Sequence, residues 1–192
     1  MEEEFIRAAE FHGHICPGLA IGYRVAKYAK KNFHRSEDEE LVCIAENDSC
    51  SVDAVQHMLG CTRGKGNLIL KDHDKQAFTF YSRSNDKALR IYFKKDLSEG
   101  MGSLRERAFR GELSPVEEKA FRAKRGEIID YILNARDDEI LDVKEVSIPV
   151  PEKAKIYPSL ECQECGEKFM EIKGRTAKGK LLCPECFEKL TR

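Results

Sequence analysis

The chain of 192 residues is long enough for one ordinary domain and a small second one. Hydrophobic residues make up 41% and charged residues 35%, which is typical of a soluble globular protein, and the near balance of 33 basic against 34 acidic side chains excludes a global basic field for nucleic acid. No apolar run approaches the ~20 residues of a membrane span and the acidic, amphipathic start is unlike a signal peptide, so we expect a cytoplasmic protein without membrane attachment.

The first third of the chain predicts helices around a buried strand. After a short acidic helix, residues 16–33 predict a helix with Pro17 in its first turn, where a missing N–H costs nothing. Residues 40–46 predict a buried strand, and residues 51–60 a short helix capped by Gly60. The helix after Pro17 carries small residues at helical spacing that would let another backbone approach closely: Gly18, Gly22, Ala26 and Ala29.

The middle of the chain predicts a β-hairpin over residues 76–94, with its turn at Ser84-Asn85-Asp86. Ser114 and Glu117 form a capping box that opens a long amphipathic helix, and residues 139–151 alternate as one more strand. Strands and helices are mixed without regular βαβ alternation. The sequence therefore predicts an α+β fold for the core domain.

Three prolines and no periodicity mark residues 149–159 as a linker. Beyond it lies a segment of about 35 residues with too few apolar side chains to fold unaided, a size at which a metal is usually required. We therefore expect a core domain over residues 1–155 and a small C-terminal zinc-ribbon domain over residues 156–192.

The C-terminal segment contains two C-x2-C pairs, Cys162 with Cys165 and Cys183 with Cys186. Each pair forms a tight knuckle that directs two thiolates at one point, and two knuckles complete the tetrahedral shell that structural zinc prefers. The alternative, four unrelated surface cysteines, does not account for this spacing. Four thiolates leave no open position, so the sequence predicts a structural zinc and not a catalytic one.

The loop between the knuckles is basic, because it has a local charge of +4 from Lys173, Arg175, Lys178 and Lys180 and no acidic residue. Across residues 157–192, however, seven basic side chains face six acidic ones. The loop could contact an acidic protein surface or, with weaker support, the phosphates of a nucleic acid; a simply solvated loop is the alternative.

The stretch FHGHICPG, residues 11–18, contains three good transition-metal ligands. On an extended segment, His12 and His14 would point to the same face, and Cys16 falls at the start of the proline-led helix, where N–H groups and the helix dipole stabilise a thiolate. Cys50 also begins a helix. We expect His12, His14, Cys16 and Cys50 to hold a second transition metal, with zinc as the expected ion; buried structural cysteines are the alternative.

Three further residues near these ligands are candidates for roles in catalysis or ligand binding. Asp53, one helical turn after Cys50, could be a general base or a carboxylate that orients a ligand. Cys61 could line the same cavity, so Cys16, Asp53 and Cys61 are the candidate catalytic residues. Lys65 lies in the glycine-rich loop 60–68 and could contact an anionic ligand, although this loop is not a Walker A motif.

Three stretches, residues 11–26, 50–68 and 142–167, resemble the FmdE family, named after a component of formylmethanofuran dehydrogenase. The C-terminal segment also resembles the small zinc fingers of DksA/TraR-type regulators. The FmdE resemblance implies an α+β core whose His and Cys residues line an active-site cavity, intertwined homodimers and, in some members, an appended zinc finger. The matching positions are His12, His14, Cys16, Cys50, Asp53, Gln56, Cys61, Lys65 and Asn67.

The complex that gives the family its name reduces carbon dioxide onto methanofuran with a molybdenum or tungsten pterin that its other components carry. The present sequence has no ferredoxin-like cysteine run and no dinucleotide fingerprint. Two hypotheses follow, and neither decides whether the chain is an enzyme. One is a dimeric metal-binding accessory protein of one-carbon or molybdoenzyme metabolism, and the other is a regulator, metal sensor or adaptor that binds protein or nucleic acid through the zinc finger.

Overall fold

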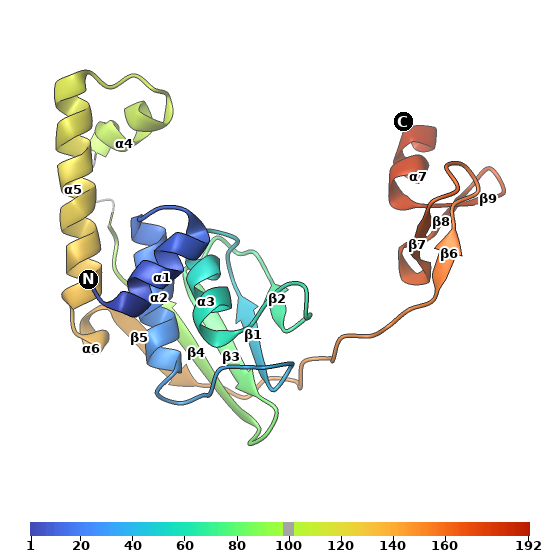
Figure 1. Cartoon of the computed structure of the whole chain (residues 1–192), viewed down its shortest axis with the longest axis horizontal. Helices are drawn as coiled ribbons and strands as arrows, with labels where there is room; N and C mark the ends of the chain where they lie inside the picture. Colours follow the sequence, from blue (N-terminus) through green and yellow to red (C-terminus); the bar gives the residue numbers. More distant parts are fainter. Residues whose placement is uncertain (98–101) are drawn as a thin grey trace. The chain divides into compact units, whose positions relative to one another are not determined.

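The computed structural model describes residues 1–97 and 102–192, which form two compact units, Met1–Lys153 and Ala154–Arg192 (Figure 1). The division falls close to the boundary expected after residue 155. None of the helices in the described ranges is long and apolar enough to cross a membrane.

The first unit contains a five-stranded sheet in the order β2-β1-β3-β4-β5. Its strands are β1 (Leu41–Ala45), β2 (Leu68–Leu70), β3 (Ala77–Ser82), β4 (Lys87–Phe93) and β5 (Leu141–Glu145). Strands β1 and β2 are parallel and all other neighbours are antiparallel. The expected hairpin is confirmed, because Ser82 of β3 pairs with Lys87 of β4. The core is thus a mixed arrangement of helices and strands, as the α+β prediction required.

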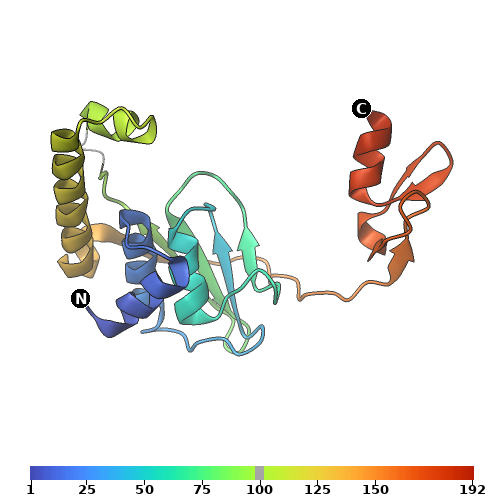
Figure 2. The same cartoon turned by 45° about the horizontal axis from the view of Figure 1, so that its top comes forward.

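Three helices pack together over one face of this sheet (Figures 1 and 2). They are α1 (Glu3–His12), α2 (Pro17–Ala29) and α3 (Ser51–Leu59). Between them and the sheet lies the hydrophobic core, in which Leu19, Val55, Phe78, Phe80 and Ile91 are fully buried. Burial of these side chains is the main term that stabilises the unit.

Helices α2 and α3 approach each other closely at the small residues of α2. A Cβ atom added to Gly22 would lie 2.0 Å from the carbonyl oxygen of Ser51, and one added to Gly18 would lie 3.1 Å from the Cβ of Cys50. The small-residue face was expected to receive another backbone, and a second copy of the chain is one partner that such a face could receive. It instead receives α3 of the same chain, so this face gives no support to a dimer.

The first unit also contains α4 (Gly102–Phe109), α5 (Pro115–Asn134) and α6 (Asp137–Ile140). The capping box predicted at Ser114 is confirmed. At the other end of α5, the buried guanidinium of Arg24 donates to the carbonyls of Ile132 and Ala135 and to the carboxylate of Asp137. Because the last carbonyls of a helix lack partners within it, Arg24 satisfies them and ties α5 to α2.

The second unit is a small assembly of short elements. They are β6 (Ser159–Glu161), β7 (Lys168–Met170), the 3-10 helix η1 (Glu171–Lys173), β8 (Arg175–Ala177), β9 (Lys180–Leu182) and α7 (Pro184–Thr191). Its buried cluster consists of Leu182 and three cysteines, Cys162, Cys183 and Cys186, with a few half-buried apolar side chains around them. An interior of this composition cannot supply much hydrophobic stabilisation.

Candidate metal centres

The second unit brings its four cysteines together as one cluster. The sulfur atoms of Cys162, Cys165, Cys183 and Cys186 all lie within 4.8 Å of one another. Gly166 has a left-handed backbone with φ +75° and donates its N–H to the Cys162 carbonyl at 2.9 Å, which closes the first knuckle. The cluster is consistent with a zinc finger.

The thiols of this cluster differ in their electrostatic surroundings. Backbone N–H groups of Cys165 and Cys183 point at the sulfur of Cys162 and lower its pKa to about 6. Burial and the neighbouring thiols raise the pKa of Cys186 to about 12. A divalent cation supplies the opposite charge that allows all four thiols to deprotonate together.

A second cluster, which we call the core cluster, consists of His12, His14, Cys16 and Cys50. Their ligand atoms also lie within 4.8 Å of one another. Cys16 is the N-cap of α2 and Cys50 the N-cap of α3, so the expected positions of both thiols at helix starts are confirmed.

The expectation that His12 and His14 share an extended segment is wrong. His12 is the last residue of α1, and Gly13 ends that helix in a left-handed conformation with φ +94°. This turn, and not strand alternation, brings the two imidazole rings together, with their centroids 4.4 Å apart. Only a residue tolerant of positive φ fits between them without strain.

Asp53 orients one imidazole of the core cluster. Nδ1 of His12 lies 2.7 Å from Oδ2 of Asp53, and Nε2 lies 3.8 Å from the sulfur of Cys16. Gln56 donates to the other carboxylate oxygen of Asp53 at 3.1 Å. When Nδ1–H donates to the carboxylate, the lone pair of Nε2 is directed into the cluster, which is the usual arrangement of a carboxylate, a histidine and a metal.

The two thiols of the core cluster are held in different ways. The backbone N–H of Leu19 donates to the sulfur of Cys16 at 3.3 Å, which fixes the position of this sulfur at the start of α2. Burial, followed by the neighbouring Cys16, raises the pKa of Cys50. A bound divalent cation would reverse this effect, because it stabilises both thiolates.

A buried polar network fixes the start of α3, and with it Cys50. Oδ1 of Asn47 accepts from the backbone N–H of Ser49 at 3.2 Å and from its hydroxyl at 2.8 Å. Gln76 donates to the Ser49 hydroxyl at 2.9 Å, and the Ser51 hydroxyl donates to Oε1 of Gln76 at 2.8 Å. Hydrogen bonds that do not involve the cluster therefore determine where Cys50 lies.

Two residues expected near the site make other contacts. Cys61 is fully buried, donates to the carbonyl of Leu41 at 3.5 Å, and has a pKa raised to about 12 by desolvation. The ammonium of Lys65 donates to the carbonyls of Ser36 and Glu37 at 3.3 Å and 3.1 Å. These contacts support the fold; the catalytic role of Cys61 and the anion contact of Lys65 stay predictions.

A cavity of about 770 Å³ opens beside the core cluster, and His14, Cys16 and Cys50 form part of its wall. The rest of the wall comes from α2, from the segments that precede α3 and β3, from the end of β4 and the residues after it, and from α4 and α5. No motif of the sequence placed α4 or α5 beside the core cluster. Its apolar side chains include Ile21, Tyr92, Phe93, Phe121 and Ile128, and its basic ones are Lys75, Lys95, Arg105 and Arg125. Among the described residues that line it, Cys61 is absent, contrary to expectation.

The chain is similar in sequence and in fold to known proteins. A probable S-adenosyl-L-methionine-binding protein of Archaeoglobus fulgidus is 30% identical over 94% of this chain, and the chain spans about half (51%) of that relative. The crystal structure of an FmdE-like protein of the tungsten formylmethanofuran dehydrogenase type, from Syntrophus aciditrophicus, is similar with a TM-score of 0.62 and 26% identity, over 97% of this chain and 92% of that one.

The sequence profile described as FmdE, molybdenum formylmethanofuran dehydrogenase operon, matches residues 11–142. The matched region contains all four residues of the core cluster and ends before the cysteines of the second unit. Since it covers more than half of the sequence, this chain belongs to the FmdE family.

Proposed function

We propose that this chain is a metal-binding protein in which the core cluster holds an exchangeable transition metal and the four-cysteine cluster holds a structural zinc. The observation that carries the proposal is the convergence of two imidazoles and two thiols within 4.8 Å, with His12 oriented by Asp53. Nitrogen and sulfur ligands in this number suit zinc among the common divalent ions.

A metal ion in the core cluster would be accessible to small molecules from the cavity, whereas the four-cysteine cluster has no position left for a further ligand. His14, Cys16 and Cys50 line the cavity, so an ion held by them would face it. There it would act as a Lewis acid or bind a small ligand. His12 lies behind them and is held in place by its contact with Asp53.

Family membership supports a role in one-carbon or molybdoenzyme metabolism. Membership in the FmdE family and similarity to an FmdE-like protein of the tungsten formylmethanofuran dehydrogenase type favour an accessory function in one-carbon or molybdoenzyme metabolism. We propose that the chain acts as a cytoplasmic homodimer. A sedimentation mass of one chain at micromolar concentration would contradict the dimer.

The test of metal binding is elemental analysis per chain of the wild type, Cys16→Ser and Cys165→Ser, before and after chelation under reducing conditions. We expect the wild type to hold two metals and the core metal to leave first, more readily at mildly acidic pH, because imidazole ligands then take up protons. Cys16→Ser should lack the labile metal and keep the other one. A wild type with one metal, lost in Cys165→Ser and kept in Cys16→Ser, would contradict the core site.

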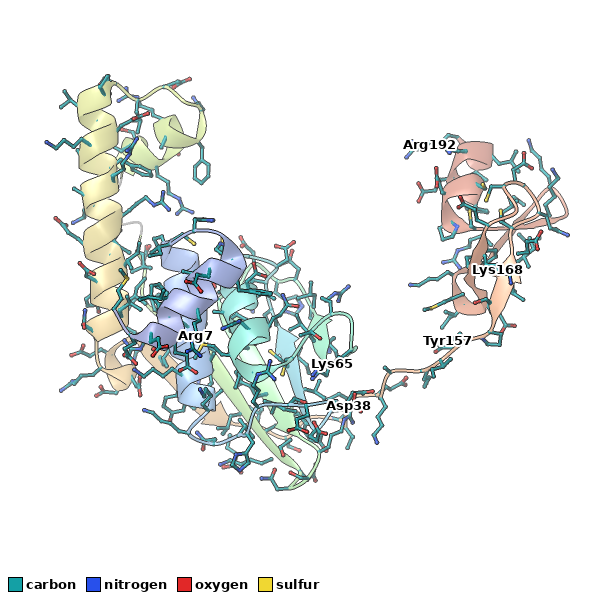
Figure 3. All side chains as sticks on the ribbon, viewed as in Figure 1. Arg7, Asp38, Lys65, Tyr157, Lys168 and Arg192 are labelled. Atoms are coloured by element: carbon teal, nitrogen blue, oxygen red, sulfur yellow. The ribbon has the colours of Figure 1, made fainter. Side chains whose placement is uncertain are left out.

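A second candidate function, that of a regulator or adaptor, is favoured by the exposed basic loop of the second unit. Lys173, Arg175 and Lys178 are basic residues of this loop, whereas Lys180 pairs with Glu164 at 2.6 Å, which lowers the effective charge of the loop. Lys168 adds a further exposed cation on β7 (Figure 3). In this function the core metal would be the sensed signal and the loop would contact an acidic protein or nucleic acid.

Elution from heparin at rising salt tests the second function. Replacing Arg175 and Lys178 by Gln should lower the salt concentration of elution if the loop forms the contact. The matched control replaces Lys189 and Arg192, which removes the same charge elsewhere in the unit. Equal elution of both double variants would argue against a role for the loop.

S-adenosylmethionine, the ligand named for the archaeal relative, is not our proposed ligand. The match covers only 51% of that relative, so its binding site can belong to the other half. Basic residues also outnumber carboxylates in the cavity wall, whereas S-adenosylmethionine is a sulfonium cation.

A further inference from the structure

The cavity beside the core cluster has an excess of positive charge. Among the residues that the structure describes, its wall contains four basic side chains, those of Lys75, Lys95, Arg105 and Arg125, and two carboxylates, those of Asp74 and Asp96. Within residues 1–97 and 102–192, neither of the two guanidinium groups forms an ion pair. This charge pattern would attract an anion and disfavour a cation.

Each guanidinium instead lies over an aromatic ring at cation–π distance. Arg105 lies over the ring of Phe109 at 5.9 Å, and Arg125 lies over that of Phe121, also at 5.9 Å. A contact with an aromatic ring uses none of the N–H donors of a guanidinium in an ion pair, so these donors can bind a carboxylate, phosphate or sulfonate.

The remaining wall is apolar and partly aromatic. Tyr92, Phe93 and Phe121 contribute rings, and Ile21 and Ile128 contribute aliphatic surface. A volume of about 770 Å³ is within the range of cavities that hold small organic ligands and larger than an inorganic ion needs. The wall therefore suits a ligand with a flat apolar body.

We propose that this cavity binds a small organic anion with a flat apolar body. Its acidic group pairs with Arg105 and Arg125, its body lies against the aromatic wall, and its other end reaches the core cluster. The anion pairing stands on the geometry of the cavity alone. The contact of the opposite end with a metal rests on the proposed function.

Two fluorescent probes with the same aromatic body test the proposal on the full-length protein. 1-Anilinonaphthalene-8-sulfonate carries a sulfonate, and N-phenyl-1-naphthylamine is its neutral counterpart. Arg125→Gln and Arg105→Gln should each weaken binding of the anionic probe about fivefold, because one charge-assisted pair at a partly exposed site is lost. Binding of the neutral probe should change by less than about twofold, since both variants keep the apolar wall.

Arg122→Gln is the matched control. Arg122 lies on the same helix as Arg125, is exposed, pairs with Glu118 and is outside the cavity wall. Failure of the wild type to bind the anionic probe, equal losses for both probes, or an equal loss in Arg122→Gln would each overturn the proposal. Core-metal content, measured on the same samples, separates the two proposals: its absence from the wild type refutes the core site, while the probe comparison still decides anion binding.

Discussion

The two cysteine-containing clusters of this protein show opposite relations between a metal site and its fold. Both bring four ligand atoms within 4.8 Å of one another. In the second unit the cysteines are themselves most of the buried interior, together with Leu182. In the first unit Cys16 is one member of a much larger hydrophobic core, and Cys50 packs against that core.

The difference indicates whether metal binding or hydrophobic burial supplies the free energy that folds the unit around each site. A unit with few buried apolar side chains needs its metal in order to fold, so metal binding and folding are one event. In the first unit, helix packing and the hydrogen-bond network around Asn47 and Gln76 position the residues of the core cluster. We therefore expect loss of a metal ligand to unfold the second unit, whereas loss of a ligand from the core cluster should lower metal affinity and leave the first unit folded.

The largest effect is expected for Cys165→Ser. Loss of one thiolate opens a closed four-cysteine site, and most of the stability of so small a unit comes from its metal. Residues 160–192 should unfold while the core stays intact. Limited proteolysis measures this, with Cys16→Ser as the control; a mutant segment as resistant as that of the wild type would contradict the structural-metal interpretation.

The next effect concerns the packing that forms the core cluster. Gly22→Ala places a Cβ where the backbone of Ser51 lies, so α2 and α3 must separate, and we expect the first unit to lose about 3 kcal/mol of stability. Because Cys50 precedes Ser51, the variant should also lose core metal while keeping the metal of the second unit. Urea unfolding followed by circular dichroism, with metal analysis, checks both; unchanged stability would show that the helices can adjust.

A smaller effect is expected when the orientation of His12 is disturbed. Asp53→Asn replaces the carboxylate that accepts from Nδ1, so the affinity of the core site for zinc should fall about 10- to 100-fold without unfolding. Competition with a chelator of known affinity measures the change. Asp48→Asn removes the same charge at a nearby exposed position, and an equal loss there would refute the specific role of Asp53.

The smallest effect on stability is expected at Gly126, a glycine with room for a side chain. Gly126 lies within α5, and a Cβ added there meets nothing within 4 Å. Gly126→Ala should therefore stabilise the first unit by about 0.5–1 kcal/mol through a less flexible unfolded chain and better helix propensity. Urea unfolding measures the change in stability, with Gly22→Ala as the comparison. If Gly126→Ala also destabilised the first unit, the backbone contact at Gly22 would not be what distinguishes the two glycines.

Local signals in the sequence predicted local structure correctly. The capping box at Ser114 and the left-handed cap at Gly60 are both present, because each depends on residues within one turn. The α4 helix and the α7 helix after Cys183 were not predicted. The short, polar α4 gave no distinctive hydrophobic pattern, whereas α7 is amphipathic and begins at Pro184, so its signals were present in the sequence and were missed.

Long-range arrangements were predicted less well. The small residues of α2 were correctly identified as a site of close approach, but the partner is α3 of the same chain. The sequence offers no rule that distinguishes a neighbour within the chain from one in another copy of it. The turn at Gly13 was also missed, since alternate spacing of His12 and His14 fits an extended segment as well as a helix end.

The four-cysteine cluster could be determined from the sequence alone, because each knuckle places its ligands through contacts between near neighbours in the chain. The candidate ligands of the core cluster could be named from the sequence, but only the tertiary structure decided that they meet. Their convergence depends on the packing of α2 against α3 at Gly22 and on the end of α1 at Gly13. The cavity and the two arginines in its wall were decided by the fold alone, because the wall combines side chains from helices and strands that are distant in the sequence.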